Sequence, residues 1–539
     1  MTTLPAGLSP NPRVGPARLS IPDVTLPEFV FGQAHRYGDK RALIEVSTGR
    51  EASHRQLAIA VQAVAAGLMA RGVTTGDVVG VCAPNGIDFV TAVHGAMVSG
   101  ATVTMLNPLA APWELRRQLR RAGVRTLVTT VALYAEKLAA VARSEQITDT
   151  YLIGDAGDDI RGACGFEALA AIGRERLSAA DEVEALGRPN ALVTPSDVAL
   201  LPFSGGTTGM PKGVMLTHRS LVVSISQTAT AHRATEQDVG IVALPLSHIY
   251  AFQATLNPTL RAGGTVVIPP AYEIGTFLEA IERFGVTRAE VVPPMVKDLA
   301  DSPLVAEHDL SSLRVILSCA APLGFAVADA CSQRIGCKVK QAFGMTELAG
   351  GALVAPDDGP DWPWLVGPAL PGVECRVLDP ETGSDRGVGE PGELLVRAAN
   401  LMSGYLNDPD ATAAAIDVDG WLHTGDIVTV DEHGWFRVVD RIKELIKVRG
   451  AQVVPAELED LLLSHPAVSD AAVVGIPDQE TGERPKAFIV SVGPVTKGEL
   501  SAWVADKVSP YKRIDRIEFI DQIPRSAAGK ILRRSLVGR

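Results

Sequence analysis

Short apolar runs alternate with helical patterns from about residue 25 to residue 366. Val78–Ala83 is strand-like, Arg55–Arg71 carries apolar residues at helical spacing, and Pro112–Ala122 has the pattern of a charged helix. The other elements predicted here are strands at Thr102–Leu106, Thr126–Thr130, Thr150–Ile153, Val198–Phe203, Val239–Ala243, Thr265–Ile268, Glu290–Val292 and Val315–Ser318, and a helix at Ile274–Phe284. Strands that alternate with helices favour parallel sheets covered by helices. The sequence therefore predicts an α/β fold.

The length of 539 residues predicts several domains, because single hydrophobic cores stop growing beyond roughly 250–300 residues. Residues 1–25 are Pro-rich and are expected to form a poorly ordered lead-in. Two α/β subdomains are predicted at about 25–190 and 191–366, each with a helix-flanked sheet. Short alternating runs with Gly and Pro turns predict a small β-barrel at 367–440; they are Glu374–Leu378, Gly392–Arg397, Ile427–Val430 and Trp435–Val439. These parts form a predicted N-terminal domain, 1–442.

Residues 443–539 are predicted to form a separate, small and mobile α+β domain. Its predicted elements are helices at Pro455–Ser464 and Lys497–Val508 and strands at Ala471–Ile476 and Lys486–Val492.

Charge and cysteine usage exclude several classes of protein. The formal net charge of −12 disfavours nucleic acid as a partner, because an acidic surface repels phosphate backbones. The six cysteines are scattered without a CxxC pair, which fits neither a disulfide framework nor a zinc site. Phe89–Trp113 contains no Asp, Glu, Lys or Arg, but Gly100 and Pro108 interrupt it, so we expect a helix, a turn and a buried strand, with no membrane insertion. The N-terminus lacks the apolar core of a signal peptide, and a cytoplasmic protein is expected.

The segment Ser204–Gly213, with the sequence SGGTTGMPKG, follows a predicted buried strand. Its glycines allow several backbone N–H groups to point into one concavity, where they bind anions. Hydroxyl groups and the charge of Lys212 add further donors. The segment is not a Walker A loop, because Gly213 follows the lysine where that motif has Ser or Thr. A flexible linker is the alternative, but the buried strand and the single lysine beside Pro211 favour a phosphate-binding loop.

Two further motifs, Gln341–Glu347 (QAFGMTE) and Trp421–Asp426 (WLHTGD), follow this loop in the chain. Together the three segments resemble the adenylate-forming superfamily, which includes acyl- and aryl-CoA ligases, luciferases and the adenylation domains of nonribosomal peptide synthetases. The resemblance extends from about residue 25 to the end. The subgroup that looks nearest is 4-coumarate–CoA ligase, through Pro245–Ala251 (PLSHIYA) and Asp440–Lys447 (DRIKELIK).

This resemblance implies a reaction in two halves. A carboxylate attacks the α-phosphate of ATP, giving acyl-AMP and pyrophosphate, and a thiol then displaces AMP. A carboxylic acid with a pKa of about 4.3 is an anion at neutral pH and a poor electrophile, so adenylation supplies a leaving group. Because two anions must meet, the enzyme needs cations and oriented donors. The implied cofactors are ATP, Mg²⁺ and coenzyme A.

The resemblance also assigns the nucleotide site, residue by residue. The matching ATP- and AMP-binding positions are Ser204, Gly205, Gly206, Thr207, Thr208, Gly209, Lys212, Ala321, Gln341, Ala342, Phe343, Gly344, Met345, Thr346, Asp426, Val438, Arg441 and Lys530. Thr208 and Glu347 match the metal positions, and Thr346 is expected to bond the α-phosphate. Asp426 and Arg441 are expected to bind the ribose hydroxyls. Phe343 stands where the family usually has Tyr, so adenine stacking is expected without a phenol hydroxyl.

Lys530, in Pro524–Lys530 (PRSAAGK), resembles the catalytic lysine of adenylation. His248 matches the position beside the acyl carboxylate, where it would screen the approach of two anions. Lys443 matches the hinge about which the C-terminal domain would rotate. Its second face would bring Lys447, Arg449, Gly450 and Ala451 to CoA, with Lys447 and Gln452 as further catalytic positions.

The acyl pocket is expected to be lined by His248, Tyr250, Ser318, Ala320, Ala342, Gly350, Gly351 and Ala352. Pro245–Leu256 contains no acid, so a buried ammonium would lack a counterion, and an amino acid substrate is disfavoured. Coumarate-type ligases usually have Gly at position 342 and Pro-Val near 350–351. Ala342 is expected to move one wall of the pocket inward. Gly350 and Gly351 are expected to open another wall. The resulting pocket favours an aryl or bulky alicyclic or polycyclic acid.

Four functions remain as alternatives at this stage. The first is an acid–CoA ligase, and the second is a ligase that loads a carrier-protein thiol. The third is a luciferase-like oxygenase. A catalytically dead adenylate-binding protein is the fourth, disfavoured because Lys212, Glu347, Asp426, Arg441 and Lys530 are present together. The sequence gives no prediction of oligomeric state.

Overall fold

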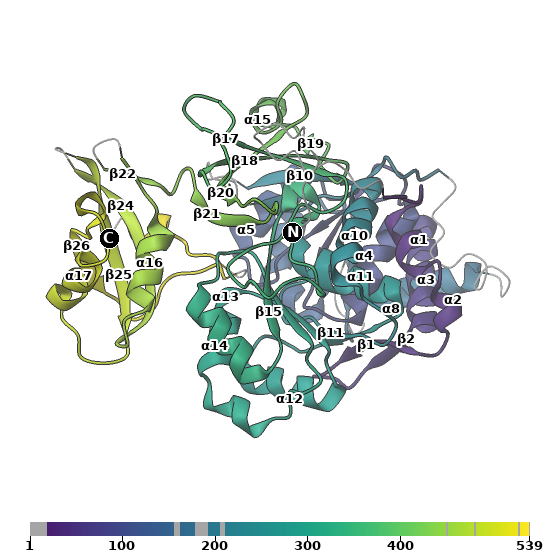
Figure 1. Cartoon of the computed structure of the whole chain (residues 1–539). Helices are drawn as coiled ribbons and strands as arrows, with labels where there is room; N and C mark the ends of the chain where they lie inside the picture. Colours follow the sequence, from purple (N-terminus) through teal and green to yellow (C-terminus); the bar gives the residue numbers. More distant parts are fainter. Residues whose placement is uncertain are drawn as a thin grey trace.

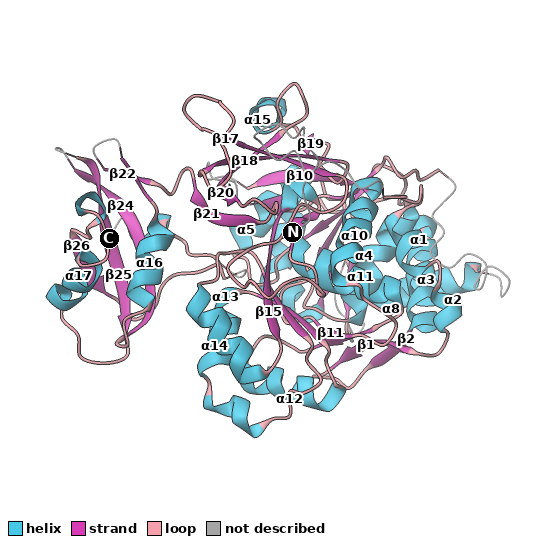
Figure 2. Cartoon of the chain, in the orientation of Figure 1, coloured by secondary structure: helices cyan, strands magenta, loops and turns pink. Residues whose placement is uncertain are grey.

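The computed structural model of the chain describes residues 19–155, 162–177, 192–204, 211–448, 451–478, 481–526 and 529–537. Figure 1 shows a large body with a smaller C-terminal domain beside it, at left. Helices and strands alternate through the large body, as the sequence predicted, and Figure 2 shows helices on both sides of its sheets. The α/β fold class is thereby confirmed.

One sheet of the large body has eight strands. Their order is β16 (Gly350–Val354), β15 (Lys338–Met345), β14 (Val315–Ser318), β13 (Arg288–Val291), β11 (Val239–Ile241), β12 (Thr265–Ile268), β1 (Arg41–Glu45) and β2 (Glu51–Ser53). Neighbouring strands are parallel except at the two ends, where β1 pairs with β2 and β15 with β16 in antiparallel fashion. The carboxyl ends of the central strands therefore share one edge.

The second sheet has nine strands. Eight follow the order β19 (Gly404–Tyr405), β10 (Lys212–Thr217), β8 (Val198–Leu200), β4 (Thr102–Met105), β3 (Val78–Cys82), β5 (Thr126–Thr130), β6 (Asp149–Ile153) and β7 (Cys164–Gly165), and β9 (Phe203–Ser204) pairs with β10. The predicted strand Val198–Phe203 is thus two strands. Pro202 lies between them, and a proline has no N–H to give to a ladder.

Helices pack between and outside these sheets. In the first half of the large body they are α1 (Leu26–Phe31), α2 (Ala34–Tyr37), α3 (His54–Ala70), α4 (Ile87–Ser99), α5 (Pro112–Ala122), α6 (Val131–Leu133), η1 (Tyr134–Leu138), α7 (Ala139–Ser144) and α8 (Phe166–Arg176). In the second half they are α10 (His218–His232), η2 (Ala251–Leu256), α11 (Asn257–Ala262), α12 (Ile274–Phe284), α13 (Pro293–Asp301), η3 (Pro303–Glu307), α14 (Phe325–Ile335) and η4 (Thr346–Leu348). Both α4 and α10 contact strands of the two sheets, so one hydrophobic core joins them.

The charge-free stretch Phe89–Trp113 folds as predicted. It contains most of α4, a left-handed turn at Gly100 (φ 96°) and the strand β4. Every helix of the described residues is too short or too polar to span a bilayer.

The region 367–440 holds a four-stranded antiparallel sheet, in the order β17 (Val373–Leu378), β18 (Gly392–Ala398), β20 (Leu422–Val430) and β21 (Phe436–Arg441), with α15 (Pro409–Ala415) beside it. The described strands leave β17 and β21 as edges, so they do not close into the predicted barrel. Their core is instead completed by residues of β15 and β16, such as Phe343 and Leu353. This sheet is therefore packed against the candidate site.

The C-terminal domain is built on a five-stranded sheet in the order β23 (Ala451–Val453), β22 (Ile446–Val448), β25 (Gly482–Ser491) and β24 (Val468–Asp478), with β26 (Arg516–Phe519) beside β25. Its helices are α16 (Pro455–Leu463), α17 (Lys497–Ala505), η5 (Pro510–Lys512) and α18 (Arg534–Val537). The domain has its own apolar core. The boundary at 442/443 and the hinge at Lys443 stay predictions.

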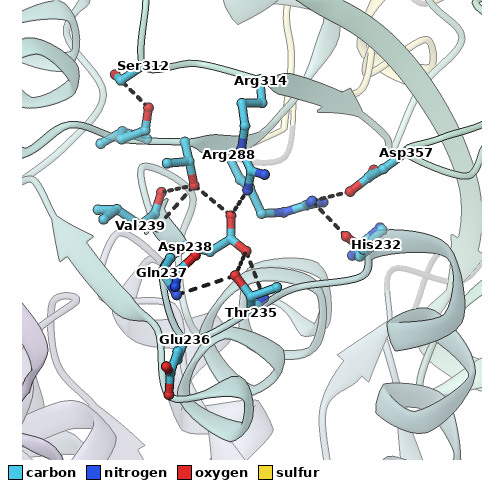
Figure 3. Close-up of polar contacts among 12 residues, drawn as sticks. His232, Thr235, Glu236, Gln237, Asp238, Val239, Arg288, Ser312, Arg314 and Asp357 are labelled. Carbon is cyan, nitrogen blue, oxygen red and sulfur yellow. Dashed lines mark hydrogen bonds and ion pairs between the residues drawn. The ribbon is translucent and has the colours of Figure 1, made fainter.

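A partly buried ionic network lies at the amino ends of β11, β13 and β14 (Figure 3). One oxygen of Asp238 accepts from the backbone N–H of Thr235 at 2.7 Å, and the other accepts from the Thr287 hydroxyl at 2.8 Å and pairs with Arg314. Arg288 donates to the carbonyl of His232 at 3.0 Å and pairs with Asp357. The network ties the strand starts together, at the edge opposite the candidate site.

Candidate active site

Several of the predicted functional residues lie at the carboxyl ends of the eight-stranded sheet. Ser318 ends β14, and Thr346 follows β15 directly. In open α/β sheets ligands bind outside these strand ends. The four-stranded sheet and the C-terminal domain bring their residues to the same edge, so the sequence motifs converge in space.

The two ends of the phosphate loop are paired with each other. Ser204 on β9 lies opposite Lys212 on β10 in an antiparallel ladder. The predicted residues Gly205, Gly206, Thr207, Thr208 and Gly209 lie outside the described residues. The ammonium of Lys212 lies over the ring of Tyr405, 4.8 Å from its centroid. The described flanks of the loop thus lie at the edge of the nine-stranded sheet, where Ser204 also contacts Glu347.

Glu347 lies in the turn η4, with 7% of its surface exposed. Its Oε1 accepts hydrogen bonds from the hydroxyls of Ser204 at 3.0 Å and Tyr405 at 2.9 Å. Among the described residues no hydrogen bond reaches Oε2, and no group of three metal-ligating side chains occurs. Mg²⁺ is commonly held by one or two carboxylates together with substrate phosphates. A single carboxylate with one free oxygen fits that role.

The predicted adenosine residues lie along β15 and the segment that follows β14. Gln341 accepts from the backbone N–H of Leu323 at 3.1 Å, and its amide donates to the carbonyl of Leu323 at 3.2 Å. This pairing fixes the loop that carries Ala320 and Ala321. Ala320 has a φ of 75°, a left-handed conformation that is costly for a non-glycine residue and is typical of functional sites.

Phe343 and Gly344 follow Gln341 on β15. Phe343 packs in the core shared with the four-stranded sheet, which Val438 also contacts. A Cβ on Gly344 would lie 2.3 Å from the carbonyl oxygen of Gly350, so this position accepts only glycine. Ala342 and Met345 lie on the same strand, where they pair with Val354 and Gly350.

Asp426 and Arg441 are cross-strand neighbours on β20 and β21. The Arg441 Nε donates to Oδ1 of Asp426 at 3.0 Å. The second oxygen, Oδ2, is buried and has no partner among the described residues. Burial raises the pKa of Asp426, although Arg441 and Lys530 act in the opposite direction. A buried acceptor without a partner is costly, so a ligand hydroxyl would satisfy it.

The charges of Asp426 and Arg441 act on Lys530, which belongs to the C-terminal domain. Burial and the charge of Arg441 lower its pKa, against the opposing effects of Glu444 and Asp426. A Cβ on Gly529 would lie 3.2 Å from Val292, at the end of β13, so the segment before Lys530 touches the large body. Figure 1 shows the corresponding yellow chain running from the C-terminal domain toward α13. The domain therefore presents its Lys530 face to the site.

A cavity of about 190 Å³ adjoins the site. Its lining is Met105, Asn107, Gln118, Phe203, Leu244, Pro245, Ser247, His248, Tyr250 and Val292. His248 is open to this cavity, and desolvation in the surrounding protein lowers its pKa. The Tyr250 hydroxyl donates to the carbonyl of Leu317 at 2.9 Å, which fixes the ring at the ends of β13 and β14. A second cavity, of about 410 Å³, lies at the opposite edge of the sheet beside Asp238, far from these residues.

Comparison with known proteins decides the family. A family model described as AMP-binding enzyme matches residues 30–406, and one described as AMP-binding enzyme C-terminal domain matches residues 457–530. The chain belongs to the AMP-binding enzyme family. A 4-coumarate–CoA ligase from Pinus taeda is 38% identical to it over 97% of both chains. The 4-coumarate–CoA ligase 2 of Oryza sativa subsp. japonica is 40% identical, over 96% of this chain and 94% of the relative.

Solved structures of the AMP-binding enzyme family show the same fold. ATP-bound MatB from Rhodopseudomonas palustris superposes with a TM-score of 0.85 at 27% identity, over 96% of this chain and 99% of that one. The o-succinylbenzoate CoA synthetase from Bacillus subtilis, in complex with its acyl-adenylate, gives 0.79 at 29% identity, over 95% and 98%. The two plant relatives are named CoA ligases, the Bacillus subtilis protein is named a CoA synthetase, and the MatB structure contains ATP. The expected family, enzyme class and cofactors are thereby confirmed.

In this AMP-binding enzyme, the predicted acyl wall includes Gly350 on β16. Gly350 has a φ of 137°, and a Cβ there would lie 2.8 Å from the Ser224 hydroxyl and 3.6 Å from Gln253. Gly350 therefore allows β16 to lie close to α10 and η2, and the predicted opening of this wall stays a prediction. Ser318 is buried and its hydroxyl has no partner among the described residues, whereas Ala352 packs in the core with Leu353.

Of the predicted CoA face of the AMP-binding enzyme, the structure describes the side chain of Lys447. Lys447 lies on β22, and its backbone N–H donates to Glu483 of the same domain at 2.7 Å. Arg449 and Gly450 lie outside the described residues, and the side chains of Ala451 and Gln452 are likewise not described. Their roles stay predictions.

Sequence reasoning missed several residues that the structure places at the site. Tyr405 contacts both Lys212 and Glu347, and Ser224 and Gln253 form the wall beside Gly350. Asn107 and Gln118 line the cavity with His248. None of these residues stands in a motif with a distinctive spacing, so only the three-dimensional pairing reveals them.

Proposed function

We propose that this protein activates an aryl or bulky alicyclic or polycyclic carboxylic acid as its acyl-AMP and transfers the acyl group to CoA. The observation that carries this proposal is that the chain at Gly529 contacts Val292 at the end of β13, which brings Lys530 to the site, where the charges of Asp426 and Arg441 act on it. A cation there is available to the carboxylate and the α-phosphate, while Lys212 and the phosphate loop hold the pyrophosphate end.

The first half-reaction needs the substrate as an anion. A carboxylate oxygen attacks the α-phosphorus, the bond from that phosphorus to the bridging oxygen breaks, and pyrophosphate leaves. Glu347, with its free oxygen, would hold Mg²⁺, which neutralises phosphate charge when bound. Lys530 and Thr346 would stabilise charge that develops on the α-phosphate. His248 would face the carboxylate as a neutral imidazole, in keeping with its lowered pKa.

The second half-reaction exchanges AMP for sulfur. The thiol of CoA loses its proton, its sulfur attacks the acyl carbon, and the bond to AMP breaks. Rotation about Lys443 would remove Lys530 and bring the Lys447–Ala451 hairpin to the site. CoA as the acceptor is supported by the relatives, which are named CoA ligases.

The chemistry of the cavity supports the substrate class. The lining of the 190 Å³ cavity contains no carboxylate that would pair with an α-ammonium. Glu290, a buried acid on β13, is already paired with Arg288 at 3.4 Å. Structures at 25% and 29% identity contain anthranoyl-AMP and o-succinylbenzoyl-AMP, both aryl acyl-adenylates. We place the enzyme in the cytoplasm.

A panel of carboxylic acids tests this function. Pyrophosphate release is measured with ATP and Mg²⁺ for cinnamic, benzoic, alicyclic, fatty and amino acids, with and without CoA. We expect release with aryl or alicyclic acids and a stoichiometric acyl-CoA product. Turnover only with amino acids would refute the substrate class. An acyl-AMP that transfers only to a carrier-protein thiol, or that consumes oxygen, would refute CoA as acceptor.

A further inference from the structure

The segment Met402–Leu406 joins two parts of the ATP site that lie far apart in the sequence. The backbone N–H of Met402 donates to the carbonyl of Glu347 at 2.8 Å. In the same segment, Ser403 donates to the carbonyl of Met215 at 2.9 Å and Leu406 to that of Gly213 at 2.8 Å. The segment that contains the short strand β19 thus fixes the backbone of Glu347 relative to the strand that begins at Lys212.

Tyr405, in this segment, contacts the side chains of both Glu347 and Lys212. Its hydroxyl donates to Oε1 of Glu347 at 2.9 Å. The face of its ring lies against the Lys212 ammonium, 4.8 Å from the centroid, which is the geometry of a cation–π interaction. The two contacts use different parts of the side chain, so they are separable by mutation.

The arrangement keeps opposite charges apart. In the described residues no ion pair joins Lys212 to Glu347, although both flank the phosphate loop. A direct pair would occupy the carboxylate that Mg²⁺ needs and the ammonium that the phosphates need. Tyr405 gives each charge a neutral partner instead. The hydroxyls of Tyr405 and Ser204 both bind Oε1, and among the described residues no hydrogen bond reaches Oε2, which is thereby left to a metal ion.

We propose that Tyr405 is a positioning residue for metal-bound ATP: its hydroxyl orients the Glu347 carboxylate, and its ring holds Lys212 away from that carboxylate. The proposal rests on the proposed function, in which Glu347 holds Mg²⁺ and Lys212 holds the phosphates. Tyr405 is not a catalytic residue, because it acts through these two side chains.

Calorimetric titration separates the hydroxyl from the ring. The affinities of the full-length enzyme for ATP are measured with Mg²⁺ and with EDTA, so the readout does not depend on turnover. Tyr405→Phe keeps the ring and should weaken binding of Mg·ATP by about tenfold, because it removes one hydrogen bond to a charged group. Binding of metal-free ATP should not change. Tyr405→Leu should weaken binding in both conditions, because Lys212 also loses its partner.

Two further variants make the result decisive. Tyr272→Phe is the matched control, because the Tyr272 hydroxyl donates to Asp298 at 2.9 Å away from the site; neither affinity should change. Glu347→Gln should weaken binding of Mg·ATP selectively.

If Glu347→Gln has this effect and Tyr405→Phe binds Mg·ATP like the wild type, the positioning role is wrong while the proposed function stands. If Glu347→Gln also binds Mg·ATP normally, the metal assignment in the proposed function is wrong. Equal losses with Mg²⁺ and EDTA in Tyr405→Phe would show a packing role and overturn the proposal.

Discussion

The carboxylate of Asp426 uses only one of its two oxygens within the protein: Oδ1 accepts from Nε of Arg441 at 3.0 Å, whereas Oδ2 is buried and unpartnered among the described residues. Asp426 is 3% exposed, so water does not readily satisfy that oxygen. The cost of such an acceptor is recovered when a donor binds. Arg441 orients the carboxylate through Oδ1. We infer that a bound ligand donates the hydrogen bond that Oδ2 lacks.

Asp426→Asn should therefore weaken ATP binding. Loss of a charged acceptor costs about 1.5–3 kcal/mol, or roughly tenfold to a hundredfold in affinity. The measurement compares ATP with 2′-deoxy-ATP and 3′-deoxy-ATP in wild type and variant. At least one deoxy analogue should be less sensitive to the substitution, because the hydroxyl that binds Asp426 is already missing.

Asp385→Asn is a matched control for this comparison, because Asp385 pairs with Arg376 at 2.8 Å in the same four-stranded region. It should bind all three nucleotides normally. If Asp426→Asn weakened ATP and both deoxy analogues equally, the ribose assignment would be wrong.

Lys530→Ala should separate the two half-reactions. Removal of a cation that acts at the α-phosphate should reduce pyrophosphate exchange by at least about a hundredfold, in the range seen when one charge-stabilising donor is lost. Thioester formation from supplied acyl-AMP and CoA should change little, because the proposed domain rotation removes Lys530 in that step. Lys497→Ala, at an exposed position of the same domain, serves as control. Equal loss in both half-reactions would contradict the rotation.

The environment of Lys530 also predicts a pH dependence. A free lysine has a pKa of about 10.4, and burial and Arg441 lower that of Lys530. The cationic form is the active one, so adenylation should decline as pH rises through this lowered pKa. The measurement is kcat/KM for pyrophosphate exchange up to about pH 10.5. In Lys530→Arg the decline should disappear from this range, because a guanidinium stays protonated; a decline unchanged in that variant would assign it to another group.

Much of the fold could be predicted because local periodicity decides it. The bounds of α5 and α12 agree residue for residue with the predicted Pro112–Ala122 and Ile274–Phe284. Both helices have one apolar face and end at a glycine in the left-handed conformation, so the sequence contains their limits. Whether the strands at 367–440 close into a barrel could not be predicted from local periodicity, because it depends on which distant residues cover the sheet.

The candidate site was predictable only where its residues stand in motifs. Lys212, Glu347 and Asp426 belong to segments of several matching residues, and the structure brings them to one edge. Tyr405 contacts Glu347 across 58 positions of the chain, and no local pattern connects them. The same holds for Ser224 beside Gly350, a contact that exists only because α10 packs against β16.

Because His218 is buried as a neutral side chain, we expect the folded protein to lose stability in mild acid. His218 is 1% exposed, its Nδ1 accepts from the backbone N–H of Leu26 at 3.2 Å, and burial lowers its pKa from 6.5 to about 4. Because the unfolded chain binds the proton more tightly, the contribution of His218 to stability is full above pH 6.5 and is lost as pH falls toward 4.

His218→Asn keeps an acceptor at the δ position and removes the titration. Between about pH 7.5 and pH 5, the wild type should lose about 2 kcal/mol of unfolding free energy relative to this variant. Urea denaturation of both proteins at the two pH values measures the difference. A gap that stays constant with pH would show that His218 is not held neutral in the folded protein.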